Sequence, residues 1–550
     1  MFFVQVVDSK KLQAKAVDQW TRELPIIARR GDIVDTNGKV LVSSQGKYSV
    51  YARLKSVVDK ENTAKVLSNI LELDYNSLVK KLNSSVSEVT IKVNCEKEEI
   101  QKLKEYSLSG VYFSICNSRV YPYDNSLCQV LGYTTNDGTG QSGIEEYYNK
   151  YLKGINGEIL YESDLVGVDI DGKSTHYIEA VDGLNLKLTI DLDIQLACDD
   201  VIEYACQKYT PKSASAIVMD CNNGEILALS VKPDFNLNEV PRDDLDTLNK
   251  LSRLSLVVDS YEPGSTFKII TSAINIEEYL KGNKKAFSNV HVFNSSRYRY
   301  VGGTKIKCWS NHANGKHANQ NLSQALNTSC NPIFVDIALS LGKKTYYNYL
   351  NAFNFGKVTG IDYSGEAIGM LVPESAVTEN DLARIGFGQT IAVTPIQLLA
   401  GVVSCVNGGN YYTPHLVKEI YDNSENLTQN FDTSVQGTPI SEKTSKILSS
   451  YLEDVVTSGS GKNAYIEGYR VGGKTGTAQK YQDGKIAFGK YIMSFVGFFP
   501  ANSPKYCALV IVDEPVGGTY GSTVAAPLCK EIFQKIIDLK NIKPELVEIK

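Results

Sequence analysis

Hydrophobic and polar positions alternate over short stretches, and they predict strands at both ends of the second half of the chain. Residues 214–219 and 226–231 are apolar runs joined by an Asn-Asn-Gly turn, which is a strong signal for a β-hairpin. Residues 492–499 and 507–512 form a second pair of buried strands, and residues 526–539 have the periodicity of an amphipathic helix. Mainly helical sequence lies between these strands, so we predict one sheet assembled from distant segments and covered by helices.

The first third of the chain has shorter and more polar runs. Residues 39–183 contain no group of residues with an evident catalytic pattern, although residues 96–106 and 143–154 are typical of helices. Residues 186–195 are expected to form a strand that leads into a helix, which is a plausible domain boundary.

These differences in hydrophobic pattern predict three segments of a mixed α/β, or α+β, multidomain protein. We expect a non-catalytic N-terminal domain over residues 1–185, a catalytic domain over residues 186–540 and a C-terminal linker over residues 541–550.

Composition narrows the class of protein. Hydrophobic residues at 43% and charged residues at 22% are typical of globular chains, and the formal charge of -5 gives no reason to expect a nucleic-acid partner. No stretch reaches the roughly 18 apolar residues that span a membrane. The apolar start at residues 1–7 runs directly into polar sequence. We interpret it as the end of a transmembrane anchor that lies upstream; a natural N-terminal strand is the alternative.

A serine and a lysine mark the first candidate for chemistry. Ser265 and Lys268 follow a Pro-Gly pair at an apparent helix start, so that the two side chains share one helical face. The pair is a nucleophile with an adjacent base, provided that burial lowers the pKa of the lysine. Alone, this spacing is weak evidence, because it often occurs by chance and a capped helix start explains it better.

Two further motifs strengthen the case. Ser329 and Asn331 flank one residue, so that in extended or turn geometry both side chains project to the same side. Lys474, Thr475 and Gly476 lie in an expected strand, where glycine permits a close approach of the backbone. Each motif alone is common, but the three in this order form a set.

The set Ser-x-x-Lys, Ser-x-Asn and Lys-Thr-Gly resembles the active-site motifs of penicillin-binding proteins and serine β-lactamases. Segments 188–191, 217–228 and 386–395 are similar to class B penicillin-binding proteins, and residues 30–38 resemble the start of the non-catalytic pedestal of that class. An Arg-Gly-Asp adhesion motif at residues 30–32 is therefore rejected. Within the class, the segments around Cys308 and Cys330 look most like the sporulation branch.

The resemblance implies a fold and a reaction. The fold is an antiparallel sheet sandwiched by helices, standing on an elongated β-rich pedestal. The reaction is D,D-transpeptidation of peptidoglycan stem peptides, supplied from lipid-linked precursors and inhibited covalently by β-lactam antibiotics. A membrane-anchored, extracytoplasmic enzyme and a membrane-embedded glycosyltransferase partner are further implications.

The same resemblance assigns roles to residues. Ser265 is the nucleophile and Lys268 its base; Ser329 relays a proton to the leaving group, and Lys474 tunes that relay. Asn331 holds the substrate amide. The terminal carboxylate is bound by Thr475 or Thr477 beside Gly476, and the backbone N–H groups of Ser265 and Thr477 form the oxyanion hole.

Histidines and cysteines gather near the Ser-x-Asn motif. Two thiolates and two imidazoles satisfy a closed tetrahedral zinc site, which would be structural because no coordination position stays open. The resemblance to sporulation-branch sequences favours the set His291, Cys308, His317 and Cys330. His312 is a reserve ligand, since it shares a face with Cys308 only if that stretch is helical. Buried thiols and solvated histidines without a metal are the alternative.

Three other functions remain open. A carboxypeptidase or β-lactamase would use the same serine but transfer the acyl group to water. A β-lactam receptor would signal rather than catalyse. A metallohydrolase would use the histidines, would need an open coordination position and would remain active without Ser265.

Overall fold

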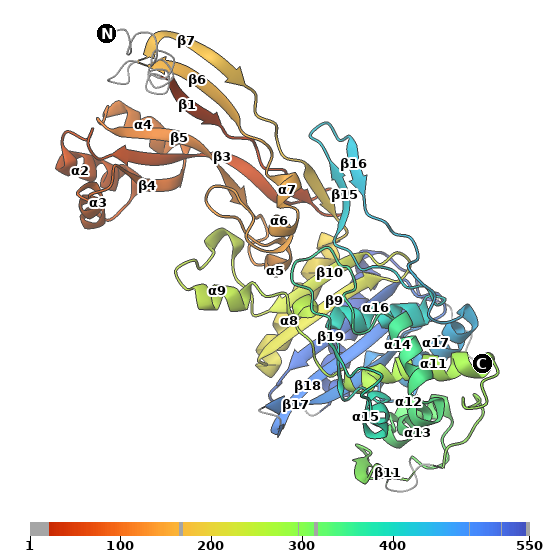
Figure 1. Cartoon of the computed structure of the whole chain (residues 1–550). Coiled ribbons are helices and arrows are strands. Elements are labelled where there is room, and N and C mark those ends of the chain that lie inside the picture. Colours follow the sequence, from red (N-terminus) through yellow and green to blue (C-terminus); the bar gives the residue numbers. More distant parts are fainter. Residues whose placement is uncertain are drawn as a thin grey trace, which may run out of the picture.

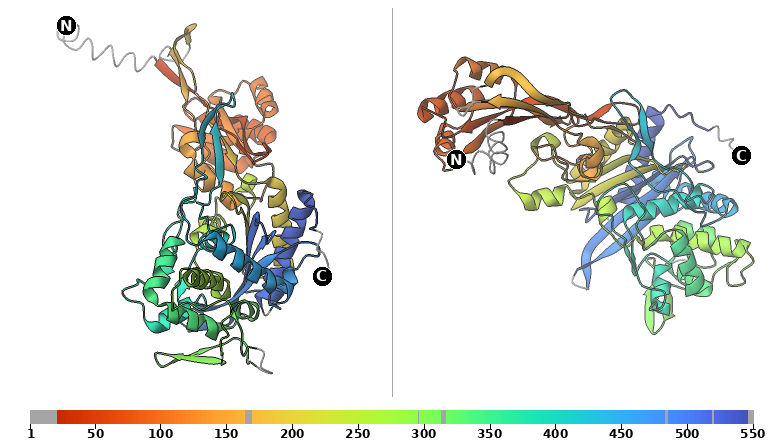
Figure 2. Two further views of the ribbon diagram at one scale, coloured as in Figure 1. Left: turned by 90° about the vertical axis from the view of Figure 1, so that its right-hand side faces the viewer. Right: turned by 45° about the horizontal axis from the view of Figure 1, so that its top comes forward.

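The computed structural model describes residues 21–163, 169–294, 296–312, 317–482, 485–518 and 520–545. A β-rich pedestal and a larger catalytic part lie end to end (Figures 1 and 2). Within the described residues, no helix has the length and apolar character that a membrane crossing requires. The apolar start at residues 1–7 lies outside the described residues.

Long antiparallel strands and short helices build the pedestal. The small sheet has the order β1-β6-β7, and the large sheet contains β2, β3, β4, β5 and β8. The strands are β1 (Thr21–Ile26), β2 (Ile33–Val34), β3 (Val40–Arg53), β4 (Glu88–Cys95), β5 (Val111–Val120), β6 (Gly157–Ser163), β7 (Asp169–Ile178) and β8 (Asn185–Leu188). The helices are α2 (Lys60–Leu71), α3 (Tyr75–Leu82), α4 (Lys97–Glu105), α5 (Cys128–Leu131), α6 (Gly143–Tyr147) and α7 (Asn149–Leu152).

The outer end of the pedestal has a hydrophobic core of its own. Helices α2, α3 and α4 cover the end of β3 and β4, and their buried side chains form a cluster that is separate from the cores of the catalytic part. Leu67, Leu78 and Leu103 from the three helices are each at most 2% exposed. This end can therefore hold its shape independently of the catalytic site.

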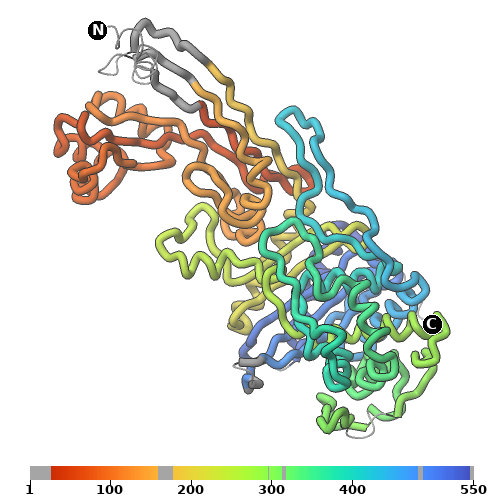
Figure 3. Tube along the Cα trace, viewed as in Figure 1, coloured from red at the N-terminus to blue at the C-terminus, as the bar shows by residue number. Residues whose placement is uncertain are grey.

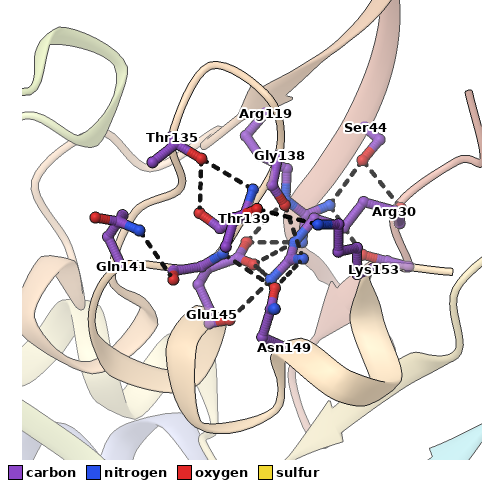
Figure 4. Close-up of polar contacts among 12 residues, drawn as sticks. Arg30, Ser44, Arg119, Thr135, Gly138, Thr139, Gln141, Glu145, Asn149 and Lys153 are labelled. Carbon is purple, nitrogen blue, oxygen red and sulfur yellow. Dashed lines mark hydrogen bonds and ion pairs between the residues drawn. The ribbon is translucent and has the colours of Figure 1, made fainter.

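A buried ion-pair network holds the inner part of the pedestal together (Figure 4). Arg30 Nε donates to Glu145 Oε2 at 2.6 Å, and Arg119 Nε donates to Glu145 Oε1 at 2.8 Å. Arg30 also donates to the Gly138 carbonyl at 3.0 Å and to Asn149 Oδ1 at 2.7 Å. Arg30 is only 3% exposed and Glu145 is fully buried. A guanidinium in this position is inaccessible to an adhesion receptor.

The catalytic part is built on a five-stranded antiparallel sheet in the order β10-β9-β19-β18-β17. Its strands are β9 (Ser213–Asp220), β10 (Ile226–Lys232), β17 (Gly472–Gln482), β18 (Lys485–Phe499) and β19 (Tyr506–Asp513). The predicted hairpin at 222–224 is confirmed, because it joins β9 to β10. The two predicted C-terminal strands are confirmed as β18 and β19, which pair with each other.

Helices cover both faces of this sheet (Figure 1). Helices α8 (Leu192–Tyr209) and α18 (Gly521–Leu539) pack on one face and α11 (Lys268–Leu280), α16 (Pro395–Val406) and α17 (Glu442–Thr457) lie on the other. The remaining helices are η2 (Leu237–Glu239), α9 (Leu245–Leu251), α10 (Ser255–Val258), η3 (Gly264–Phe267), α12 (Leu322–Thr328), α13 (Asn331–Leu341), α14 (Lys343–Ala352), α15 (Glu379–Ile385) and η5 (Lys462–Ala464). The remaining strands are β11 (Tyr298–Val301), β12 (Thr304–Lys307), β13 (Met370–Leu371), β14 (Ile391–Ala392), β15 (Val417–Tyr421) and β16 (Leu427–Asn430).

A hairpin from the catalytic part joins the pedestal (Figure 3). Strand β15 pairs with β8, which pairs in parallel with β2, so that the β15–β16 hairpin extends the large pedestal sheet. Asp362 reinforces the junction: it accepts hydrogen bonds from Tyr148 Oη at 2.8 Å and from the backbone N–H groups of Leu416 and Val417 at 2.7 and 2.8 Å. The two parts are therefore connected by strand pairing as well as by the chain.

The buried network predicts a large effect from one carboxylate. Glu145→Gln leaves two buried guanidinium groups without their counter-charge, so we expect a loss of about 3 to 5 kcal/mol in the free energy of unfolding of the pedestal, measured by urea denaturation. The adjacent, exposed Glu146 provides the control, since Glu146→Gln should change stability by no more than about 0.5 kcal/mol. Equal stabilities of the two variants would contradict the proposed importance of the network.

Candidate active site

The candidate nucleophile lies on a tight turn at the start of a buried helix. Ser265 belongs to the 3₁₀ turn η3, and Lys268 is the first residue of α11. The sequence predicted that both residues share one helical face. A 3₁₀ turn has three residues per turn and therefore also brings positions i and i+3 into line. Ser265 is partly buried, whereas Lys268 is fully buried.

The segment around Gly388 packs directly against this turn. Gly264 has φ 55° and donates its N–H to the Gly388 carbonyl at 2.9 Å. Gly388 itself has φ 83°, and a Cβ atom there would lie 2.0 Å from the Gly264 carbonyl oxygen. Only glycine permits this contact of two backbones, which explains the glycine at position 388.

Lys268 is the centre of the polar contacts in the site. Its Nζ donates to the Ser329 carbonyl at 2.8 Å and to Asn331 Oδ1 at 2.6 Å, and it lies 3.0 Å from Ser329 Oγ. The hydroxyl is the one of these three partners that can also donate a proton to the amine. The predicted convergence of Ser329 and Asn331 on one side of the chain is confirmed, because both side chains reach the same nitrogen atom.

Burial governs the protonation of this lysine. Desolvation lowers the pKa of Lys268 to about 8, although the nearby Cys308 and Cys330 side chains oppose part of that change. A lysine with this pKa is a free amine in about a tenth of the molecules at pH 7 and in about half at pH 8, and in that form it can accept a proton from a neighbouring hydroxyl.

The Ser-x-Asn motif is shaped by the junction of two helices. Ser329 ends α12 in the left-handed conformation with φ 55°, and Asn331 begins α13 directly after it. Cys330 lies between them and is fully buried. Asn331 Nδ2 also donates to the Lys307 carbonyl at 3.3 Å, which ties the motif to strand β12.

The third motif lies on β17, the edge strand of the sheet. Lys474 is fully buried, and its Nζ donates to the Thr475 carbonyl at 3.3 Å. Burial, together with the charge of Lys268, holds the pKa of Lys474 well below its ordinary value. A Cβ atom at Gly476 would lie 2.3 Å from Ser494 Oγ and 3.0 Å from Thr266 Cγ2. Glycine at this position therefore lets β17 approach the nucleophile turn.

Thr477 connects the edge strand to the next segment of the fold. Its Oγ1 accepts a hydrogen bond from the Gly521 N–H at 3.1 Å. A Cβ atom at Gly264 would lie 3.4 Å from the Thr477 carbonyl oxygen, so β17 passes directly beside the nucleophile turn. The three motifs thus lie next to one another around Ser265.

Two thiols and two imidazoles meet behind the Ser-x-Asn motif. The ligand atoms of Cys308, His312, His317 and Cys330 all lie within 4.8 Å of one another. Cys308 Sγ lies 3.7 Å from His317 Nδ1, and Cys330 Sγ lies 3.9 Å from His312 Nε2. A tetrahedral zinc ion with bonds of about 2.0 to 2.3 Å places its ligand atoms about 3.3 to 3.8 Å apart. The two distances above are near this spacing, and the whole set, which extends to at most 4.8 Å, would contract around such an ion.

The electrostatics of the cluster also favour a metal. Cys330, followed by His317 and His312, lowers the pKa of the Cys308 thiol despite burial. The environment therefore favours the thiolate, which is the form that binds metal ions.

The structure corrects one member of the predicted ligand set. His291 does not belong to the cluster; its ring packs against Phe287 and Phe293, with ring centroids 4.7 Å away in each case. His312 takes its place. The sequence argument made His312 depend on a helix that includes Cys308, whereas His312 in fact lies outside any helix, with φ 55°. An irregular segment with a left-handed residue, rather than a helical face, brings its ring to the two thiols.

Three side chains at the site escaped the sequence analysis. Ser460 Oγ lies 3.4 Å from Thr475 Oγ1, beside the third motif. The exposed rings of Trp309 and Tyr520 meet edge to face with centroids 6.1 Å apart, and Trp309 Nε1 donates to the Thr328 carbonyl at 3.0 Å. A tryptophan next to Cys308 could have been recognised in the sequence as a candidate site residue. That residues 309, 460 and 520 all lie near the three motifs follows only from the fold.

Family comparisons agree with this geometry. The transpeptidase domain of penicillin binding proteins matches residues 214–534, and the penicillin-binding protein dimerisation domain matches residues 25–188. The stage V sporulation protein D of Bacillus subtilis is 37% identical over 100% of this chain and 84% of its own length. The peptidoglycan D,D-transpeptidase FtsI of Escherichia coli is 26% identical over 99% of this chain and 89% of its own length.

Solved structures show the same fold. A peptidoglycan synthetase from Bifidobacterium adolescentis has a TM-score of 0.77 at 24% identity and covers 96% of this chain and 98% of its own. Penicillin binding protein 3 from Mycobacterium tuberculosis, complexed with aztreonam, has a TM-score of 0.72 at 22% identity and covers 95% and 99%. With the three motifs assembled around Ser265 and both domains matched, the chain belongs to the penicillin-binding protein transpeptidases, as a strand-rich pedestal carrying a mixed α/β transpeptidase domain.

Proposed function

We propose that this transpeptidase cross-links peptidoglycan stem peptides through an acyl-enzyme on Ser265. The convergence of Ser329 and Asn331 on the buried Lys268 amine is the observation that carries the proposal. Residues 186–540 would perform the chemistry, residues 1–185 would act as the pedestal, and residues 541–550 would be a linker. Because stem peptides lie outside the cytoplasmic membrane, we place the catalytic part there, held by a membrane anchor and partnered by a membrane-embedded glycosyltransferase.

Acylation begins with proton transfer to Lys268. The Ser265 Oγ–H bond breaks as its proton moves to the free amine of Lys268, and Oγ bonds to the carbonyl carbon of the penultimate D-alanine. The negative charge on the carbonyl oxygen is stabilised by the backbone N–H groups of Ser265 and Thr477, each worth about 10² to 10³ in rate. A β-lactam reacts in the same way when its ring carbonyl occupies this position.

The leaving group is then protonated. The tetrahedral intermediate collapses, the bond to the terminal D-alanine nitrogen breaks, and this nitrogen receives a proton from Ser329, whose hydroxyl is resupplied by Lys268. The 3.0 Å separation of Ser329 Oγ from Lys268 Nζ supports this relay. Lys474 tunes it electrostatically, since its charge and that of Lys268 disfavour each other.

Substrate is held on both sides of the nucleophile. The edge strand β17 offers Thr475 and Thr477 to the terminal carboxylate, and Gly476 keeps the strand close to the turn. Asn331 holds the substrate amide from the opposite side.

An amine of a second stem peptide then attacks the ester carbonyl and forms the cross-linking amide. The bond from this carbon to Ser265 Oγ breaks, and the proton lost by the amine returns to Oγ through Lys268.

Transfer to water is the main alternative, as in a carboxypeptidase or β-lactamase. Deacylation by water generally needs a base close to the ester. Within the described residues, no carboxylate is hydrogen-bonded to the side chains of Lys268, Ser329, Asn331, Lys474, Thr475 or Thr477. This supports a long-lived acyl-enzyme that waits for an amine. A β-lactam receptor would form the same adduct and would be recognised by its lack of turnover with stem peptides.

We also propose that Cys308, His312, His317 and Cys330 hold a structural zinc ion. Four protein ligands leave no open position for water, so the ion would take no part in the chemistry. It would fix Cys330 and thereby the positions of Ser329 and Asn331 on either side of it. A metallohydrolase is disfavoured for the same reason.

The first test is the covalent adduct. Intact-mass spectrometry after incubation with a β-lactam panel should show one equivalent of drug on the protein and none on Ser265→Ala. Ser255→Ala, at a partly buried serine ten residues upstream, serves as the control and should be acylated like the wild type. An adduct that survives in Ser265→Ala would refute the assignment. Drug consumption with rapid return of the unmodified mass would instead identify a β-lactamase.

The pKa of Lys268 predicts how acylation depends on pH. Below pH 8 the free amine becomes scarcer by about tenfold per pH unit, so the second-order acylation rate should fall with that slope. Above pH 8 the amine predominates and the rate should reach a plateau. Stopped-flow measurements with a chromogenic cephalosporin between about pH 6 and pH 10 give the profile, because these limits lie about two units on either side of the expected midpoint. A rate that is independent of pH would contradict a lysine base.

The metal assignment makes a prediction for two histidines. Protein purified without chelator should contain about one equivalent of zinc by elemental analysis, and His312→Asn should lower that content or weaken binding at least about tenfold. His291→Asn is the matched control and should keep its zinc, because His291 lies against two phenylalanines instead. Loss of zinc from His291→Asn but not from His312→Asn would restore the ligand set expected from the sequence.

A further inference from the structure

A basic and aromatic surface lies on the hairpin that precedes the metal cluster. Strands β11 and β12 pair with Tyr298 opposite Lys307 and Tyr300 opposite Lys305. Cross-strand partners point to one face, and so do positions i and i+2 of a strand. These four side chains therefore share a face, which we call the hairpin platform.

The two faces of the hairpin differ sharply. The opposite face carries Arg299 and Ile306, which pack toward the protein: Arg299 forms a two-point ion pair with Asp336 of α13 at 2.7 and 2.6 Å, and Ile306 is only 4% exposed. On the platform, Tyr300 is 70% exposed and both lysines are exposed. The hairpin thus packs against the protein with one face and exposes the other face to solvent.

The platform carries an excess of positive charge. Between Glu278 and Asp336 the sequence has no acidic residue but eight lysines and arginines, in a chain whose net charge is -5. Lys305 Nζ lies 3.8 Å from the centroid of the Tyr298 ring, a cation–π contact that keeps the ammonium over the aromatic surface. Within the part of the chain that the structure describes, no ion pair is formed by Lys305 or Lys307. A ligand with negative charge would meet little competition there.

The platform is also continuous with the active site. Asn331 Nδ2 donates to the carbonyl of Lys307, the last residue of β12, and the chain continues directly into Cys308 of the metal cluster. In Figure 1 and in the left view of Figure 2, the hairpin lies at the end of the catalytic part farthest from the pedestal. A long polymer could therefore reach it without meeting the pedestal.

We propose that the hairpin platform binds an uncross-linked peptidoglycan strand and presents its acidic stem peptides to the active site. The carboxylates of the stems pair with Lys305 and Lys307, and a sugar ring stacks on the exposed Tyr300, while Tyr298 holds the Lys305 ammonium in place. Charge complementarity argues for this occupant, since stem peptides carry several carboxylates while the platform carries only positive charge. The inference rests on the proposed function, because it assumes that stem peptides are the substrate.

Binding is tested on the full chain with Ser265→Ala, so that no chemistry contributes. The probe is soluble glycan strands with intact stem peptides, measured by fluorescence anisotropy at 50 and 300 mM NaCl. Lys305→Gln combined with Lys307→Gln should weaken binding at least about tenfold at low salt and remove most of the salt dependence. Lys284→Gln combined with Lys285→Gln is the matched control, because both lysines are exposed and belong to the same acid-free segment. That pair should change affinity by less than about twofold.

Further binding measurements identify the ligand. Tyr300→Ser alone should weaken binding about threefold or more, and a neutral chito-oligosaccharide should bind the starting protein at least about tenfold more weakly than intact strands. Each variant must keep the melting temperature of its parent, so that a loss of binding is not a loss of folding. Equal losses in the two lysine pairs, or equal affinity for the neutral oligosaccharide, would overturn the proposal. So would binding to phosphatidylglycerol vesicles without binding to glycan strands.

The two proposals fail in distinguishable ways. If the wild type forms no adduct with any β-lactam, the acyl-enzyme on Ser265 is refuted, while the binding assay still reports on the platform. If the adduct forms but both lysine pairs bind strands equally, the platform is refuted and the transpeptidase mechanism stands.

Discussion

Burial of the Lys268 amine is the constraint on which the active site depends. Removing an ammonium group from water costs several kcal/mol even after the protein relaxes, so a buried lysine persists only with good partners or as the neutral amine. Here the Ser329 carbonyl, the Ser329 hydroxyl and the Asn331 amide surround it. Lys474 is buried nearby, and two positive charges in one low-dielectric site disfavour each other. The fold thus favours one free amine beside the nucleophile.

The remaining structure holds this arrangement from three directions. Gly388 and Gly264 bring two backbones into contact under the nucleophile turn. Gly476 lets the edge strand approach from the side, and the cysteine and histidine cluster lies behind the Ser-x-Asn motif. The pedestal contributes less directly: its buried ion pairs and separate outer core give it rigidity, and the β15–β16 hairpin connects it to the catalytic part by strand pairing.

Local signals in the sequence predicted much of this architecture. The Asn-Asn-Gly turn, the two C-terminal strands and the three motifs are each encoded within about twenty residues, where periodicity and turn chemistry are decisive. The meeting of the motifs followed from family resemblance. Long-range pairings were missed: Arg30 and Glu145 are separated by 115 positions and Tyr148 and Asp362 by 214, and no local pattern announces either contact. The choice between His291 and His312 depended on the left-handed backbone of His312, which the sequence does not reveal.

The most direct test of the account is to change the basicity of the amine at position 268 without changing its reach. Incorporation of γ-thialysine in place of Lys268 supplies a less basic amine of nearly the same length. If Lys268 is the base, the midpoint of the pH profile for acylation of Ser265 moves to lower pH while a plateau remains. A midpoint that stays where the wild type has it would show that another group titrates, and it would contradict the central role assigned to the buried lysine.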